Sequence, residues 1–129
     1  MEQDKATQKV FIVADDKLLL DMYVLEFKSE GFDATPAFGS IDALEKMRGG
    51  LSADVVILDV SVPVMDSLDL LKVIRDEKLV SSAKFIILSN DEHLTTDEKS
   101  RELGVACYIK KTTATPGQIV EEVRKLFAQ

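Results

Sequence analysis

ADVVILDVSVPVMDS, residues 53–67, contains a continuous apolar run that ends abruptly at a carboxylate. Residues 55–58 show no polar alternation, which predicts a strand that helices cover on both faces of a parallel sheet. Asp59 follows at the carboxyl end of this strand, where open α/β sheets place their ligands. Pro63 argues against a helix that begins immediately after the strand, so Asp59 is a candidate functional acid rather than a helix cap.

Length and composition narrow the classes of protein that the chain can represent. Its 129 residues predict one domain over residues 1–129, with a core at 9–127 and no room for a second catalytic or output domain. A net charge of −7 disfavours binding to nucleic acid or anionic lipid. No apolar run reaches membrane-spanning length, residues 1–8 lack the apolar core of a secretion signal, and one cysteine suits a reducing compartment. We therefore expect a cytoplasmic protein.

Apolar runs alternate with helical patterns along the rest of the chain. We expect further strands at residues 9–14, 32–37, 83–88 and 105–109. We expect helices at residues 17–30, 40–48, 68–77, 96–103 and 116–127. Five strand–helix alternations with short links predict an α/β fold with a five-stranded parallel sheet, doubly wound by helices on both faces.

Local signals add detail to several of these elements. The first helix should bury Leu18, Leu19, Met22, Tyr23 and Leu25 and end at Gly31. Ser40 is a candidate N-cap of the second helix, and Pro36 places the second strand at a sheet edge. The fourth helix carries a capping pair, Thr95 and Glu98, but almost no apolar stripe, so it should be loosely held.

The predicted strands end in residues that carry chemistry. They are Asp15 and Asp16 after the first strand, Asp59 after the third, Ser89 after the fourth, and Lys110 and Lys111 after the fifth. Carboxylates that converge repel each other unless a cation lies among them, and Mg²⁺ prefers such oxygen ligands. A carboxylate beside a metal ion, a hydroxyl and an ammonium is typical of a phosphoryl-transfer site in which the carboxylate is the nucleophile.

On these residues the chain resembles the receiver domains of response regulators, over residues 9–127. In that family an acidic pair follows the first strand, which matches Asp15 and Asp16. The phosphorylated aspartate follows the third strand in a context similar to LDVSVPVMDS, which matches Asp59. A serine or threonine ends the fourth strand, which matches Ser89. The resemblance therefore implies the flavodoxin-like receiver topology.

The resemblance also assigns the fifth strand end. An aromatic residue precedes the family's lysine by three positions, which matches Tyr108 and Lys111 and selects Lys111 over Lys110. It implies that Asp59, Lys111 and Ser89 form the reactive set and that Ser89 and Tyr108 act as switch residues. These assignments belong to the resemblance, because spacing alone does not choose between the two lysines.

The implied function is regulatory phosphorylation in a two-component system. A sensor histidine kinase, a phosphotransfer protein or a small donor would phosphorylate Asp59, with Mg²⁺ held by Asp15, Asp16, Asp59 and the backbone carbonyl of Ser61. The signal would pass through the face made by the fourth helix, fifth strand and last helix, to a downstream protein or effector domain. The same face allows a homodimer. Such a domain is not an enzyme beyond self-phosphorylation from small donors and slow autodephosphorylation.

Several positions depart from the family pattern. Thr112 replaces the usual proline after the lysine, and a non-proline cis bond costs about 2.5–4 kcal/mol, so we expect a trans Lys111–Thr112 peptide and a displaced amine. Val64 and Ser67 replace frequent glycines, which predicts another path for the loop after Asp59. Asn90 replaces a small alanine and should narrow access for the phosphodonor. The resemblance also implies that Ser61 and Asp91 tune how water reaches the acyl phosphate, and that Asn90 is a further tuning position.

Other interpretations of these residues stay open. Asp15 or Asp16 alone is more often a helix N-cap than a metal ligand, and Tyr108 alone is an ordinary half-buried strand aromatic. His93 is expected to be solvated, and Cys107 to be a small buried hydrophobe. A pseudo-receiver that signals by contacts alone, without phosphorylation, is the main alternative function. A flavodoxin-like cofactor binder is a further one, although the chain lacks its phosphate-cradling loop.

Overall fold

The computed structural model of the protein describes residues 7–60, 65–90 and 102–128. Its centre is a five-stranded parallel sheet in the order β2-β1-β3-β4-β5. The strands are β1 (Lys9–Ala14), β2 (Asp33–Phe38), β3 (Val55–Asp59), β4 (Lys84–Ser89) and β5 (Val105–Lys110). The predicted parallel α/β sheet is confirmed, and the strand that contains Pro36 lies at an edge.

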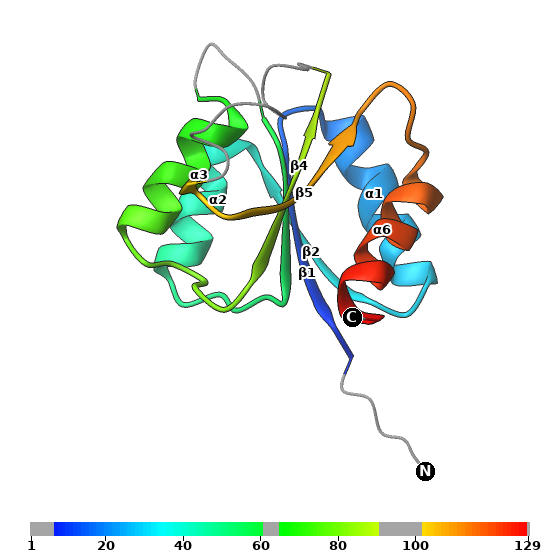
Figure 1. Cartoon of the computed structure of the whole chain (residues 1–129), viewed down its shortest axis with the longest axis horizontal. Coiled ribbons are helices and arrows are strands. Elements are labelled where there is room, and N and C mark those ends of the chain that lie inside the picture. Colours follow the sequence, from blue (N-terminus) through cyan, green and yellow to red (C-terminus); the bar gives the residue numbers. More distant parts are fainter. Residues whose placement is uncertain (1–6, 61–64, 91–101, 129) are drawn as a thin grey trace.

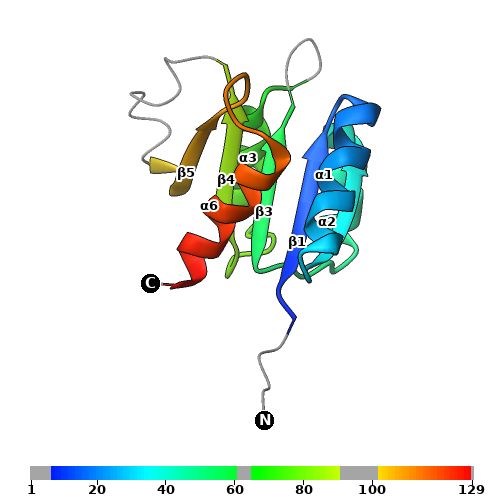
Figure 2. The same cartoon turned by 90° about the vertical axis from the view of Figure 1, so that its right-hand side faces the viewer.

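Helices cover both faces of this sheet (Figures 1 and 2). On one face lie α1 (Lys17–Ser29) and α6 (Pro116–Ala128), and on the other lie α2 (Gly39–Arg48) and α3 (Ser67–Asp76). The bounds agree with the predicted helices to within one residue for these four elements. Nearly all of the helix expected at residues 96–103, with its capping pair, lies outside the described residues. None of the helices that the structure describes is long and apolar enough to cross a membrane.

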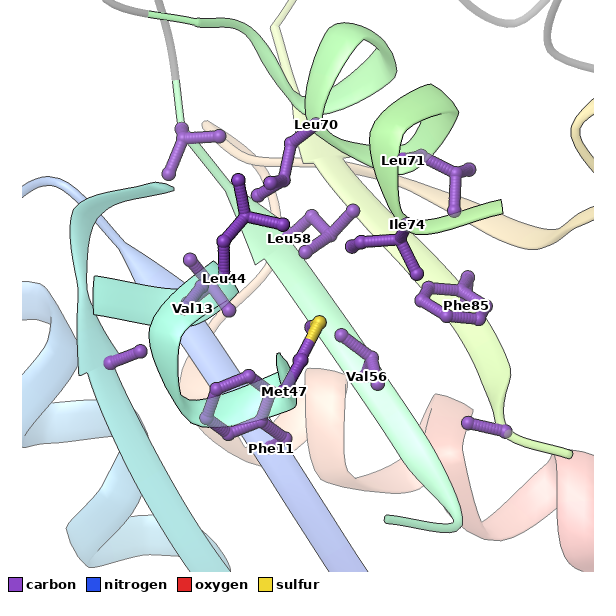
Figure 3. Close-up of a cluster of buried hydrophobic side chains, with 14 of the residues drawn as sticks. Phe11, Val13, Leu44, Met47, Val56, Leu58, Leu70, Leu71, Ile74 and Phe85 are labelled. Atoms are coloured by element: carbon purple, nitrogen blue, oxygen red, sulfur yellow. The ribbon is translucent and has the colours of Figure 1, made fainter. Parts of the chain in front are cut away.

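The central strand β3 joins the two halves of the core. All five of its residues are buried, and successive side chains point to opposite faces of the sheet. Val55 and Ile57 pack with residues of α1 and α6, whereas Val56 and Leu58 pack with residues of α2 and α3 (Figure 3). The unbroken apolar run therefore reflects burial on both faces, as expected for a parallel sheet.

The buried face of α1 differs from the prediction. Leu18, Met22 and Leu25 are 71%, 45% and 70% exposed, whereas Leu20 and Phe27 are buried, as is Tyr23. Apolar residues surround most of this helix, so their spacing did not define a single face. Contact with the sheet and with α6 selects the stripe formed by Leu20, Tyr23 and Phe27.

The start of α2 corrects a second prediction. Ser40 is not the N-cap: it lies inside the helix and is buried, and Phe38 precedes the helix without a side-chain cap. The carboxylate of Asp42 instead accepts a hydrogen bond from the Phe38 N–H at 3.0 Å. A carboxylate in the first turn can satisfy an N–H near the helix start, so the helix does not need the serine cap.

Ser67, where glycine is frequent in the family, has a structural role at the start of α3. Its hydroxyl lies 3.2 Å from both the backbone nitrogen and the backbone oxygen of Val60. The side chain is buried, and Asp66 before it accepts a hydrogen bond from the Asp69 N–H at 2.8 Å. These contacts attach the start of α3 to the residue that follows Asp59.

The two leucines of α1 provide a test of its buried face. Leu20→Ala is expected to lower the free energy of unfolding by about 2–5 kcal/mol, because it leaves a cavity under a fully packed helix. Leu25→Ala, on the same helix but 70% exposed, is the matched control and should change it by no more than about 0.5 kcal/mol. Urea denaturation of both variants measures the difference, and equal effects would contradict the observed face.

Candidate functional site

The carboxyl ends of four strands meet at one edge of the sheet, which is the upper edge in Figure 1. Asp15 follows β1, Asp59 ends β3, Ser89 ends β4, and Lys111 follows β5. Backbone hydrogen bonds join these ends: the Asp15 N–H donates to the Asp59 carbonyl at 3.3 Å, and the Lys111 N–H donates to the Ser89 carbonyl at 3.2 Å. The topology thus brings these four residues to one edge of the sheet.

An ion pair between Lys111 and Asp59 lies at the centre of this edge. The Lys111 Nζ is 3.0 Å from Asp59 Oδ1, and the two side chains are 28% and 7% exposed. Lys110, its neighbour, is exposed. The lysine that the family resemblance selected is therefore the one whose ammonium reaches the buried carboxylate.

Asp59 is held in an environment that disfavours its charge. Burial raises the pKa of the Asp59 carboxyl above its ordinary value, and the charges of Asp15 and Asp16 raise it further, although the hydrogen bond and charge of Lys111 act in the opposite direction. Its Oδ2 atom is buried and has no hydrogen-bond partner within the residues that the structure describes. A carboxylate with one satisfied and one unsatisfied oxygen is poised to accept a further electrophile or cation.

The structure shows that Asp16 caps a helix, which was one of the two interpretations that the sequence allowed. Its Oδ1 accepts hydrogen bonds from the N–H groups of Leu18 and Leu19, at 3.0 and 3.2 Å, so it is the N-cap of α1. The capping role does not remove its charge from the site, since that charge contributes to the raised pKa of Asp59. Asp16 therefore shapes both the start of α1 and the field around Asp59.

The donor set suits a hard cation only in part. A divalent ion prefers oxygen donors and a surplus of negative charge. The predicted ligands Asp15, Asp16 and Asp59 are carboxylates, and the Asp59 Oδ2 atom has no partner among the described residues. Among the described residues, however, no three acidic, histidine or cysteine side chains stand close enough to enclose an ion. Ser61, the fourth predicted ligand, lies outside them. The residues present fit an ion that keeps several waters, as Mg²⁺ does.

Tyr23 lies near the site. The sequence pattern predicted for it only a place on the buried face of the first helix. Burial, then the charges of Asp59 and Asp16, raise the pKa of Tyr23 to about 12. No motif marks this residue, because its proximity to the acids depends on how α1 packs on the sheet.

Of the two expected switch residues, Ser89 lies at the end of β4 and is half-buried, beside Lys110 in the sheet register. Tyr108 lies in β5, opposite Ile87, and its hydroxyl oxygen is shielded from solvent. Its side chain packs against the core cluster on the α2 and α3 side of the sheet. Ser89 thus lies at the end of the strand beside β3, and Tyr108 lies one strand further away, in β5.

Asn90 makes a contact that the sequence did not suggest. Its Oδ1 accepts a hydrogen bond from the Thr112 N–H at 2.9 Å, so two departures from the family pattern touch each other. The remaining expected tuning positions, Ser61 and Asp91, lie outside the described residues, as do Val64 and His93. Cys107 is half-buried, and burial, followed by the nearby Glu122, raises the pKa of its thiol.

Comparison with known proteins identifies the family. The family model for the response regulator receiver domain matches residues 10–124, and the chain therefore belongs to this family. It is a receiver domain of a two-component response regulator, which is a regulatory domain. The family resemblance drawn from the sequence is thereby confirmed, and the pseudo-receiver alternative finds no support in these comparisons.

Among similar proteins, the transcriptional regulatory protein CrdR of Helicobacter pylori is 30% identical over 104 residues, which are 81% of this chain and 48% of that protein. The DNA-binding response regulator MtrA of Mycobacterium tuberculosis is 29% identical over 121 residues, which are 94% of this chain and 51% of MtrA. The chain thus spans about half the length of these curated relatives.

Solved receiver structures share the fold closely. The receiver domain of the Francisella response regulator 1452 has a TM-score of 0.79 and 25% identity, with 95% of this chain and 98% of that chain covered. The response regulator TrrA of Thermotoga maritima, solved in complex with Mg²⁺-BeF, has a TM-score of 0.77 and 28% identity, with 93% and 99% covered. The flavodoxin-like receiver topology is therefore confirmed.

The buried charge of Asp59 predicts a stability change. In metal-free buffer at neutral pH, Asp59→Asn should raise the free energy of unfolding, because burial disfavours the ionised carboxylate. The folded protein binds the Asp59 proton more tightly than the unfolded chain does. Wild-type stability should therefore recover as pH falls through the folded-state pKa toward 3.8, and the difference should vanish there.

Urea denaturation of the wild type and of Asp59→Asn, from neutral pH down to about pH 4, measures this difference. A variant that is less stable at neutral pH would show instead that pairing with Lys111 outweighs the burial of the charge.

Proposed function

We propose that Asp59 is the phosphoacceptor of this receiver domain. The observation that carries the proposal is the geometry of its carboxylate: Oδ1 is paired with the Lys111 ammonium at 3.0 Å, and the buried Oδ2 has no partner within the described residues. In the proposed reaction a carboxylate oxygen attacks the phosphorus of a phosphohistidine, an O–P bond forms and the N–P bond breaks. The imidazole leaves and takes up a proton, and Asp59 becomes an acyl phosphate.

Lys111 and Ser89 would serve the transferred group. The Lys111 ammonium is already directed at Asp59, so it can neutralise charge on the phosphoryl oxygens without reorganisation. Ser89 ends the neighbouring strand and would donate its hydroxyl to another phosphoryl oxygen. Positioning and charge stabilisation of this kind supply most of the catalysis in phosphoryl transfer.

We further propose that Asp15, Asp16 and Asp59, with the backbone carbonyl of Ser61, hold Mg²⁺. When bound, the ion would neutralise negative charge on the carboxylates and on the incoming phosphoryl group. Burial is the main cause of the raised pKa of Asp59, and the charges of Asp15 and Asp16 add to it; a cation would relieve this second contribution, which supports the assignment. The similar protein TrrA, whose structure is described as a complex with Mg²⁺-BeF, supports it further.

The phosphorylated domain would signal through a surface that includes β5 and α6. An acyl phosphate adds nearly two negative charges at the end of β3, next to β4, which pairs with β5. Ser89 lies in β4 and Tyr108 in β5, and we propose that they would connect that site to β5 and bias its conformation. We propose a sensor histidine kinase or a phosphotransfer protein as donor, and a downstream protein or effector domain as target. The similar proteins named as DNA-binding or transcriptional regulators support an effector domain.

Mass spectrometry after incubation with Mg²⁺ and acetyl phosphate tests the phosphoacceptor. The wild type should gain one phosphoryl group, and Asp59→Asn should gain none. Asp54→Asn is the matched control, because it changes an aspartate at the opposite end of β3 and should leave labelling intact. Labelling retained in Asp59→Asn would contradict the assignment, and an unlabelled wild type would favour the pseudo-receiver.

Lys111→Ala should leave labelling possible but uncouple it from the conformational change, because the ammonium no longer holds the phosphoryl group against β5 and β4. Backbone amide shifts of β5 in NMR spectra, with and without a beryllium fluoride mimic, measure that change. Lys110→Ala, the exposed neighbour, is the control and should respond as the wild type does. A normal shift of β5 in Lys111→Ala would contradict this role.

A further inference from the structure

Two consecutive residues after β5 are hydrogen-bonded to two consecutive residues at the end of β4. The Lys111 N–H donates to the backbone carbonyl of Ser89 at 3.2 Å, which extends the β4–β5 ladder beyond the Ser89–Lys110 pair. The Thr112 N–H donates to the side-chain Oδ1 of Asn90 at 2.9 Å. A side chain therefore continues the attachment of the two strand ends where the backbone ladder stops.

The local turn explains why a side chain is needed there. The Thr113 N–H donates to the Lys110 carbonyl at 3.3 Å, so the chain bends away from the sheet over residues 110–113. The amide oxygen of Asn90 spans the gap that this bend opens, and it reaches a donor 22 residues away in sequence. An alanine at position 90 would offer no acceptor, and a proline at position 112 would offer no N–H.

This bond fixes the backbone on the carboxyl side of Lys111. The N–H groups of Lys111 and Thr112, on either side of the Lys111 Cα, are both held by the end of β4. The Lys111 side chain is long and flexible, and its ammonium lies 3.0 Å from Asp59 Oδ1. Restricting its backbone therefore limits the positions that the ammonium can take relative to the carboxylate.

We propose that Asn90 is a positioning residue for Lys111, acting through the N–H of Thr112. The proposal rests on the phosphoacceptor function proposed above and deepens it. It assigns to Asn90 a structural task at the site in addition to the narrowing of donor access that the sequence suggested. Because Asn90 directly follows Ser89, the same bond ties the strand end that bears the Ser89 hydroxyl to the Lys111 turn.

The hydrogen bond itself is tested by amide hydrogen exchange. Asn90→Ala should accelerate exchange of the Thr112 amide roughly three- to tenfold, which is the range expected for loss of one hydrogen bond. Asn90→Asp keeps an acceptor oxygen and should restore protection. Thr112→Ala keeps the N–H and is the matched control, so its amide should remain protected. Unchanged exchange in Asn90→Ala would overturn the proposal.

The positioning role is tested by the rate of labelling with acetyl phosphate and Mg²⁺. Asn90→Ala should slow labelling roughly three- to tenfold when Lys111 is present, and should have no further effect in Lys111→Ala, because the ammonium that it positions is gone. Thr112→Ala should label at the wild-type rate. Equal slowing in both backgrounds would show that Asn90 does not act through Lys111. Faster labelling would show that Asn90 only limits donor access, and either result would overturn the proposal.

A stability cycle separates this proposal from the proposed function. If the wild type is not labelled at all, the phosphoacceptor role fails, but the link between Asn90 and Lys111 still has a readout. Each single variant, Asn90→Ala and Lys111→Ala, changes the unfolding equilibrium constant by some factor. The factor measured for the double variant should then differ from the product of these two factors by about threefold or more. Strictly multiplicative effects would overturn the positioning role.

Discussion

The carboxylate of Asp59 is 7% exposed, and its Oδ1 lies 3.0 Å from the Lys111 ammonium. Much of the arrangement around this edge of the sheet depends on where that buried charge lies. A charge taken out of water requires a partner of opposite sign, and the partner compensates only when its geometry is good. Here burial, together with the smaller effect of the charges of Asp15 and Asp16, outweighs Lys111, so the pKa of Asp59 remains raised. The fold tolerates this unfavourable charge because β3 is packed on both faces. The free-energy cost of the buried charge arises at the carboxyl end of the sheet, where the proposed phosphoacceptor must be reactive.

The order of strands determines which residue types can serve this carboxylate. β1 and β4 flank β3, so the acids after β1 and the hydroxyl of Ser89 come from adjacent strands. β5 is separated from β3 by β4, a gap of roughly 10 Å at ordinary strand spacing. Only a long side chain crosses that gap, which explains why the cation after β5 is a lysine whose backbone is secured to the end of β4.

Structural and functional roles coincide at this edge. Asp16 caps α1 and also contributes negative charge to the site, so the two interpretations of an acid after a strand do not exclude each other. Ser67 secures the start of α3 to Val60, and Asn90 secures the turn that contains Lys111. Both side chains stand at positions where the family usually has a smaller residue. In this chain both side chains make hydrogen bonds that the smaller residues could not make.

Patterns that depend on neighbours in sequence were readable without coordinates. Apolar runs ending in acids located β1 and β3, and Pro36 marked an edge strand. The motif around Asp59, together with Tyr108 three positions before Lys111, pointed to a receiver domain. The buried stripe of α1, the contact between Asn90 and Thr112, and the proximity of Tyr23 to the acids were decided only by tertiary packing. Periodicity cannot choose a face when apolar residues surround a helix, and a hydrogen bond between distant residues exists only once the sheet has brought its strand ends together.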